Sequence, residues 1–357
     1  MDTGQTLNRR SFLKRSVAAA AAASGPFVLR RAARAAGGVI VRNPGGAYGD
    51  AMKKAHYDPF SKATGIEVIP VAASAGKVMA MVESGNVELD VLDMTEITAL
   101  ILRQKSALEP LDYKAFQLTN LEDVADVRRP DMVGCNYSAN ILAYNTLVYP
   151  TGKHPKSWAE FWDIKRFPGP RMLQSLDAGF PELEFALLAD GVAMDKLYPI
   201  DIDRAFKAFD RIRSSISKFY DTGGIQVEML VRKEAVLGSA YNGRIQVGID
   251  GGAPLAIEWN QANVQLQVFG IVKGAPNREN ARRFIDFALQ PDRQAEFARY
   301  IPYGPTNRRA FGMIPAEFAK RLPNNYAHQT FLQNAVWWAD NRPRVAERWN
   351  QWLLQRG

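Results

Sequence analysis

Val39-Ile40-Val41-Arg42-Asn43-Pro44-Gly45-Gly46 opens the part of the sequence that decides the fold: a short apolar run closed by a turn of Asn, Pro and Gly. A helical pattern follows from about Asp50. The alternation then repeats, with strands predicted over 66–71 and 90–94 and a helix over 77–83 between them. This β-α-β-α-β order predicts a parallel sheet with right-handed crossovers, and therefore an α/β fold.

A second strand–helix unit is predicted near the other end of the chain. Val264, Leu266 and Val268 alternate with polar residues, as in a half-buried strand, and Asn277 is placed to cap the helix that follows. The apolar positions of that helix, which Pro291 is expected to end, have the spacing of one buried face: Ala281, Phe284, Ile285, Ala288 and Leu289. Four tryptophans in the last forty residues are expected to pack in the core: Trp337, Trp338, Trp349 and Trp352.

The amino-terminal segment resembles a twin-arginine export signal. Arg9-Arg10 precede Ser11-Phe12-Leu13-Lys14 and then an alanine-rich run that is too short to span a membrane. Ala33 and Ala35 bracket Arg34 in an Ala-x-Ala pattern typical of a cleavage site. We therefore expect residues 1–35 to be a signal peptide, read by the twin-arginine export machinery, and the mature protein to be periplasmic.

The charge of the chain is concentrated in this predicted signal. Residues 1–35 hold seven basic residues and one acid, which leaves 38 of the 45 basic and 36 of the 37 acidic residues in the remainder. A mature chain so close to neutral gives no reason to expect a nucleic-acid partner. Cys135 is the single cysteine, so no intramolecular disulfide can form, and we expect it to be a small buried hydrophobe.

Several segments together resemble the periplasmic solute-binding proteins of ABC importers, in the spermidine/putrescine-receptor-like family. They occur in the family's order and run from about residue 39 to 310: Asp58-Pro59-Phe60 through Thr64-Gly65-Ile66, Pro155-Lys156-Ser157-Trp158, Tyr241-Asn242-Gly243-Arg244-Ile245, Lys273-Gly274-Ala275-Pro276-Asn277 and Pro305-Thr306-Asn307. The resemblance implies two α/β lobes joined by a two-strand hinge that close on a ligand.

The resemblance also implies where the chain passes between the lobes. Crossings are expected near Asn140–Asn145 and near Val264–Gln267. Lobe one would then hold residues 38–143 and 267–313, and lobe two residues 144–266 and 314–357. A chain of this length is expected to form more than one domain in any case.

Candidate ligand-binding residues follow from the rule that ligands in α/β sheets lie beyond the carboxyl ends of the strands. In the first lobe the rule selects Tyr48, Ser74 and Glu96, which follow the first three predicted strands. In the second lobe it selects Asp177, which could instead begin a helix, and Tyr220 with Asp221. Asp221 could equally cap the helix after it.

The remaining candidates lie where related receptors approach their ligand. Tyr241 and Arg244 occupy a strand-to-turn segment, and Glu258 and Trp259 follow a Gly-Gly-Ala-Pro turn. An aromatic face beside a carboxylate suits an alkylammonium ion, whereas Arg244 could take a carboxylate or form a structural ion pair.

One departure from the family pattern affects the ligand. Polyamine receptors are expected to have an acid near the position of Gln267, so this chain has lost a carboxylate there. Together with Arg244, this change makes an ω-amino acid such as γ-aminobutyrate a candidate ligand, as an alternative to a polyamine such as putrescine or spermidine. The expected partners are this small amine or amino acid and an ABC permease with its ATPase.

Three other functions are less consistent with the sequence. An exported enzyme is disfavoured because the three histidines and one cysteine are widely spaced and no nucleophile elbow or phosphate loop is present. A ferric-ion receptor of the same fold commonly has adjacent tyrosines, which this chain lacks, and a sugar receptor would not need so many flanking acids. We therefore expect no catalytic residue, no metal and no cofactor.

Overall fold

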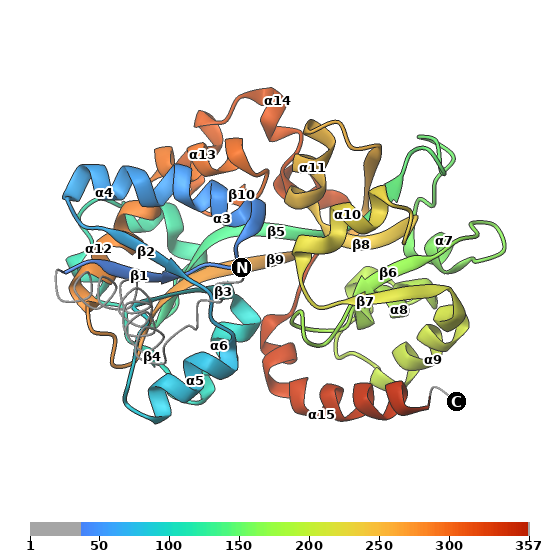
Figure 1. Ribbon diagram of the computed structural model, residues 1–357, viewed down its shortest axis with the longest axis horizontal. Helices are drawn as coiled ribbons and strands as arrows, with labels where there is room; N and C mark the ends of the chain where they lie inside the picture. The colour runs from blue at the N-terminus through green and yellow to red at the C-terminus, as the bar shows by residue number, and fades with distance from the viewer. Residues whose placement is uncertain (1–36, 356–357) are drawn as a thin grey trace, which may run out of the picture.

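One mixed sheet runs through the whole protein in the computed structural model, which describes residues 37–355 (Figure 1). Its spatial order is β2-β1-β3-β9-β5-β8-β6-β7. The bounds are β1 Val39–Arg42, β2 Val68–Val71, β3 Val91–Thr95, β5 Met132–Asn145, β6 Arg171–Gln174, β7 Ile216–Tyr220, β8 Leu237–Tyr241 and β9 Leu255–Val272. Short strands at the margins are β4 Leu108–Glu109, β10 Gly304–Pro305 and β11 Phe331–Leu332.

The two longest strands, β5 and β9, pair antiparallel and connect the two halves of the molecule (Figure 1). We call the half built on β1, β2 and β3 the first lobe and the half built on β6, β7 and β8 the second lobe. The predicted crossing points fall on this strand pair, where Asn140 is opposite Asn263. The expected two-lobed α/β fold is therefore confirmed, while the lobe ranges given above remain a prediction.

The β-α-β-α-β unit of the first lobe is confirmed: β1 is parallel to both β2 and β3. The first helix, however, begins at Gly46 and not near Asp50. Gly45 and Gly46 have φ of 73° and 59°, a backbone conformation open to glycine, so the chain turns within the Gly-Gly pair and enters the helix at once. The helices are α3 Gly46–Met52, the π-helix η1 Lys53–Tyr57, α4 Asp58–Thr64, α5 Ala75–Glu83 and α6 Glu96–Gln104.

The second lobe repeats the arrangement, with β6 parallel to β7 and to β8. Its helices are α7 Trp158–Trp162, α8 Leu183–Ala189, α9 Ile202–Ile212, α10 Gln226–Val231 and α11 Asn242–Asp250. In both lobes, therefore, the strands that lead into helices end on the same side, facing the space between the lobes.

The helix predicted after Asn277 is α12, Arg278–Ala288, and its five predicted apolar positions are buried. Asn277 does stand at the start of the helix, but its side chain accepts no hydrogen bond from the first turn, so the predicted side-chain cap was wrong. Its Nδ2 instead donates to Asp90 Oδ2 at 3.0 Å. Pro291 begins the next helix rather than ending this one. The helices that follow are α13 Pro291–Tyr300, α14 Ala316–Ala319 and α15 Ala335–Leu354.

The carboxy-terminal helix α15 contacts both lobes. Three of the four tryptophans predicted to pack are buried, and Trp337 is partly buried against the same core. Trp338 donates to Glu184 at 2.6 Å in the second lobe, whereas Asp340 accepts from Gln104 of α6 in the first lobe at 2.8 Å. The helix thus lies across the junction of the two lobes.

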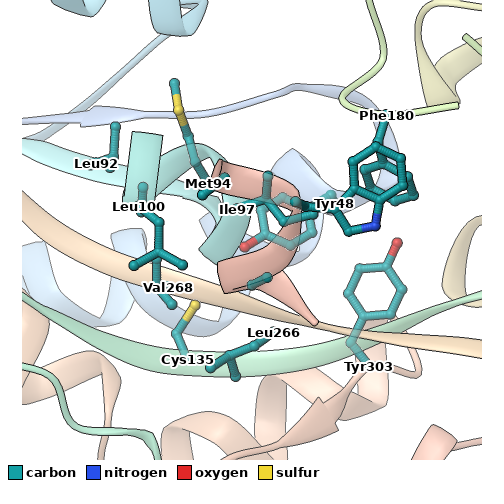
Figure 2. Packing of buried hydrophobic residues seen from close by; sticks show 14 of the residues in the cluster. Tyr48, Leu92, Met94, Ile97, Leu100, Cys135, Phe180, Leu266, Val268 and Tyr303 are labelled. Atoms are coloured by element: carbon teal, nitrogen blue, oxygen red, sulfur yellow. The ribbon is translucent and has the colours of Figure 1, made fainter. Parts of the chain in front are cut away.

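The lone cysteine lies in the core of the first lobe, beside Leu266 and Val268 (Figure 2). Burial raises the pKa of the Cys135 thiol, so it stays protonated, and the predicted role as a small buried hydrophobe is confirmed. Within residues 37–355 there is no helix with the length and apolar character needed to cross a membrane. The predicted signal peptide, residues 1–35 with Arg9 and Arg10, lies outside the described residues.

Candidate ligand-binding site

A cavity of about 310 Å³ lies between the lobes, at the carboxyl ends of the parallel strands. This is the place where the strand-end rule predicts a ligand. Six of the ten predicted residues line it: Tyr48, Ser74, Asp177, Asp221, Tyr241 and Arg244. Six lining residues that bear on the chemistry were not predicted: Arg42, Thr98, Asn136, Gln267, Tyr303 and Arg342.

The other four predicted residues lie outside the cavity. Glu96 begins α6 and pairs with Arg129 at 3.1 Å. Tyr220 is fully buried under the site, where its hydroxyl contacts Gln174 at 3.2 Å. Both residues do follow or end strands, but their side chains have partners within the protein and do not reach the ligand space.

Glu258 and Trp259 are displaced because the segment after the Gly-Gly-Ala-Pro turn is a strand and not a binding loop. Glu258 is opposite Leu142 on β5, whereas the cavity-lining Gln267 is opposite Asn136. Six residues of β5 separate these positions, which is about 20 Å along a strand. Glu258 instead pairs with His154 at 3.1 Å, and Trp259 stacks on Tyr326 with the ring centroids 4.2 Å apart.

A buried carboxylate, Asp93, supports the floor of the cavity from β3. The Tyr48 hydroxyl donates to its two oxygens at 2.9 and 3.0 Å, and Gln267 Nε2 donates to Oδ1 at 2.7 Å. Burial raises the pKa of Asp93 to about 6, against the opposing effects of Gln267, Arg42 and Tyr48. Gln267, where an acid was expected, is thus an amide donor to an acid one strand away.

Arg42 ends β1 and reaches into the same region. Its Nε donates to the Ala73 carbonyl at 3.1 Å and its Nη1 to the Asp93 carbonyl at 2.9 Å. These contacts hold the guanidinium at the cavity while the Asp93 carboxylate offsets its charge. The strand-end rule could have identified Arg42, because it is the last residue of the first strand.

Arg244 lies in the first turn of α11, and its side chain passes between two glycines of opposite lobes. A Cβ atom added at Gly46 would lie 2.9 Å from Arg244 Nη1, and one added at Gly223 would lie 2.9 Å from Nε. A side chain at either position would therefore require the guanidinium to shift from its present place. Arg244 also bonds Tyr303, which opposes the burial that raises the pKa of Tyr303 to about 12.

Five charged side chains line the cavity without an ion pair to any other described residue: Arg42, Arg244, Arg342, Asp177 and Asp221. Arg244 was considered for a structural ion pair, but no carboxylate of residues 37–355 lies within 4 Å of it. Its Nε is buried and has no hydrogen-bond partner in the described part of the chain. The site therefore presents unpaired charges of both signs inside one cavity.

Helix amino termini add to the positive side. Helices α5, α6 and α11 each begin at a residue next to or within the cavity lining, after Ser74, Thr95 and Tyr241. Free backbone N–H groups and the helix dipole favour an anionic group there. In the part of the chain that the structure describes, no cluster of three His, Cys, Asp or Glu residues has the arrangement of a metal site.

Comparison with known proteins identifies the family. The model of the bacterial extracellular solute-binding protein family matches residues 55–324. The gamma-aminobutyric acid-binding protein of Pseudomonas aeruginosa is 31% identical over 324 residues, which cover 87% of this chain and 89% of that protein. The spermidine/putrescine-binding periplasmic protein of Escherichia coli is 23% identical over 298 residues, covering 79% and 82%.

Solved structures add information on the arrangement of the lobes. The PBP AgtB of A. tumefaciens R10 in complex with agropinic acid is 34% identical and matches with a TM-score of 0.81, over 88% of this chain and 98% of that chain. AttC of Agrobacterium tumefaciens C58, in an open unliganded conformation, is 31% identical but matches with a TM-score of only 0.65, over 88% and 99%. The identities are alike, so the overall arrangement of this chain is more similar to that of the agropinic acid complex than to that of the open unliganded structure.

The fold, the cavity between the lobes and these matches confirm the predicted family and its periplasmic localisation. The chain belongs to the bacterial extracellular solute-binding proteins.

Proposed function

We propose that this protein is the receptor of an ABC importer for a small zwitterionic amino compound, of which γ-aminobutyrate is the simplest example. The observation that carries the proposal is the set of unpaired charges, Arg244 and Arg342 with Asp177 and Asp221, in one cavity between the lobes. A ligand with an acidic group and an amine would complete both sets. The names of the relatives agree, since one binds γ-aminobutyrate and another was solved with agropinic acid.

The carboxylate is assigned to the end of the cavity formed by Arg42 and Arg244. Both guanidinium groups act on the same side chain, Tyr241, where they oppose the burial that raises its pKa. An arginine fork can hold a carboxylate with two parallel hydrogen bonds. Asp177 and Asp221 are the acids available to the amine. Three charge-assisted hydrogen bonds at about 1.5–3 kcal/mol each, together with the apolar area that the lobes enclose, bring micromolar affinity, about −8 kcal/mol, within reach.

A polyamine is the second candidate, because a relative is a spermidine/putrescine-binding protein. Two features of the site disfavour it. Gln267 supplies an amide donor where a dication would need an acid, and three arginines line the cavity against two aspartates. A dication would meet an excess of like charge, which costs binding energy in a partly enclosed site.

We propose that the protein performs no chemistry and hands its ligand to a membrane permease driven by an ATPase. Among the lining residues that the structure describes, the hydroxyls of Ser74, Thr95 and Thr222 contact backbone N–H groups or another hydroxyl and not a base that could activate them. The Arg9-Arg10 motif supports export by the twin-arginine machinery. Replacing both arginines by lysine should leave the unprocessed protein in the cytoplasm, and unaltered export would refute that route.

A thermal-shift screen of the protein purified after export tests the ligand class. A ligand present at about 100 times its dissociation constant adds about 2.7 kcal/mol of stability. We expect such a shift with γ-aminobutyrate or a longer ω-amino acid, and a smaller one with putrescine or spermidine. A shift with polyamines alone, or with a sugar or ferric ion alone, would overturn the proposal.

A further inference from the structure

Arg342 is the one cavity-lining arginine that comes from the carboxy-terminal helix. It is half-buried, and its Nη2 donates to the Leu176 carbonyl at 3.2 Å, which places the guanidinium beside the loop that carries Asp177. Burial lowers the pKa of Arg342 and the charge of Asp177 opposes that effect, so the two groups are within electrostatic range. No ion pair joins them, however, nor does Arg342 pair with any other residue of the described range 37–355.

Arg342 and Asp177 form a different charged end of the cavity from Arg42 and Arg244. The charges of Arg42 and Arg244 act on Tyr241, and Arg244 bonds Tyr303, whereas the charge that acts on Arg342 is that of Asp177. Arg42 and Arg244 come from β1 and α11, and Arg342 from α15, which packs against α6. The cavity thus has a cationic end and a second end that presents one cation and one anion.

We infer that Arg342 and Asp177 form a second recognition point, which selects a ligand with a second acidic group next to its basic nitrogen. A cation and an anion held side by side but unpaired are complementary to an α-amino acid group, whose carboxylate and ammonium are also adjacent. The other carboxylate of the ligand binds at Arg42 and Arg244. The substrate class is therefore an amino-dicarboxylate or a conjugate of one, with two acidic groups and one basic nitrogen.

The volume and electrostatics of the cavity agree with such a ligand. A cavity of about 310 Å³ is at the lower end of pockets that hold drug-sized ligands, and it exceeds the needs of a four-carbon amino acid. Three arginines line the cavity against Asp177 and Asp221, and the helix amino termini add to the positive potential that results. A ligand with one net negative charge matches that potential.

Helix α15 also places Arg342 where the two lobes meet. The helix contacts α6 of the first lobe through the Gln104–Asp340 hydrogen bond, while Arg342 contacts the Leu176 carbonyl of the second lobe. A ligand group bound at Arg342 is therefore held at the junction of the two lobes. The inference rests on the proposed function and names its ligand more narrowly.

Matched pairs of ligands that differ by one carboxylate test the inference by calorimetry on the exported protein. The pairs are β-alanine with L-aspartate, γ-aminobutyrate with L-glutamate, and δ-aminovalerate with L-α-aminoadipate. In at least one pair we expect the dicarboxylate to bind about tenfold or more tightly. Arg342→Gln should remove this preference, because it should weaken binding of the dicarboxylate about tenfold more than binding of the ω-amino acid. Arg344→Gln, an exposed arginine on the same helix, is the control and should change neither.

Each outcome decides the matter. If every ω-amino acid binds at least as well as its dicarboxylate partner, the inference is wrong and the proposed function stands. If Arg342→Gln weakens both members of a pair equally, Arg342 only supports the site and the inference is also wrong. If no amino acid of either kind binds, both the inference and the proposed function are overturned.

Discussion

Replacing Arg244 by glutamine separates a ligand-binding arginine from a structural one. The side chain has no carboxylate partner within the described residues, and its Nε is buried and unpaired, so the variant orphans no buried acid. The cost to the folded protein is the bond to Tyr303, about 0.5–1.5 kcal/mol. The complex loses the hydrogen bonds between the guanidinium and the ligand carboxylate, which we expect to lower the binding free energy by about 2 kcal/mol, or to weaken binding about 30-fold.

Calorimetry measures the affinity of Arg244→Gln for the amino-acid ligand, and urea unfolding measures its stability. Arg244→Lys keeps the charge but loses the planar fork, so its affinity should be intermediate. Arg204→Gln is the matched control, because Arg204 is exposed, pairs with Asp190 at 2.6 Å and does not line the cavity. Unchanged affinity, or a loss of more than about 3 kcal/mol of unfolding free energy, would refute the assignment of Arg244 to the ligand.

Three further predictions concern the ligand class, the buried acid of the second lobe and the core. Gln267→Glu should weaken γ-aminobutyrate binding and strengthen putrescine binding, because it places a carboxylate beside the cavity. Equal changes in the affinities for both ligands, measured by calorimetry, would contradict this prediction. Burial raises the pKa of Glu182 from 4.5 to about 8, so the folded state holds a proton that the unfolded chain releases, and stability should fall as pH rises from about 4.5 to 8. In urea unfolding, Glu182→Gln should reduce this dependence of stability on pH. An unaltered dependence would refute the prediction. Trp158 is fully buried and stacks on Phe185 with the ring centroids 3.7 Å apart. Trp158→Ala should therefore lower the unfolding free energy by about 3–5 kcal/mol and leave the affinity of the folded protein unchanged. A loss below about 1 kcal/mol would contradict this packing.

The parts of the fold that could be predicted from sequence are those set by local patterns. The apolar runs of β1 and β3 and the spacing of Phe284 and Ile285 on α12 are local signals, and the structure confirms them. The start of α3 was misplaced because Gly46 can both turn the chain and begin a helix. The cap at Asn277 failed because Asp90, nearly two hundred residues away, takes its side chain.

The candidate site shows the same division between local and distant information. Tyr48, Ser74 and Tyr241 were found because each directly follows or ends a strand. Arg342 and Tyr303 could not be found that way, because α15 and the segment after α13 reach the cavity from elements outside the strand–helix units. Glu258 was predicted at the cavity because the turn before it looked like the end of a binding loop. It lies instead in a strand of eighteen residues, and the local sequence does not distinguish these two cases.

The central claim is that the cavity needs both charges of its ligand. Calorimetry with γ-aminobutyrate, butyrate and butylamine tests it most directly, because the last two compounds each lack one of the charged groups. The site predicts that the zwitterion binds at least about tenfold more tightly than either analogue, since each analogue leaves Arg244 or the aspartates without a partner. Binding of butylamine as tight as that of γ-aminobutyrate would show that the arginines do not read a carboxylate, and would contradict the account.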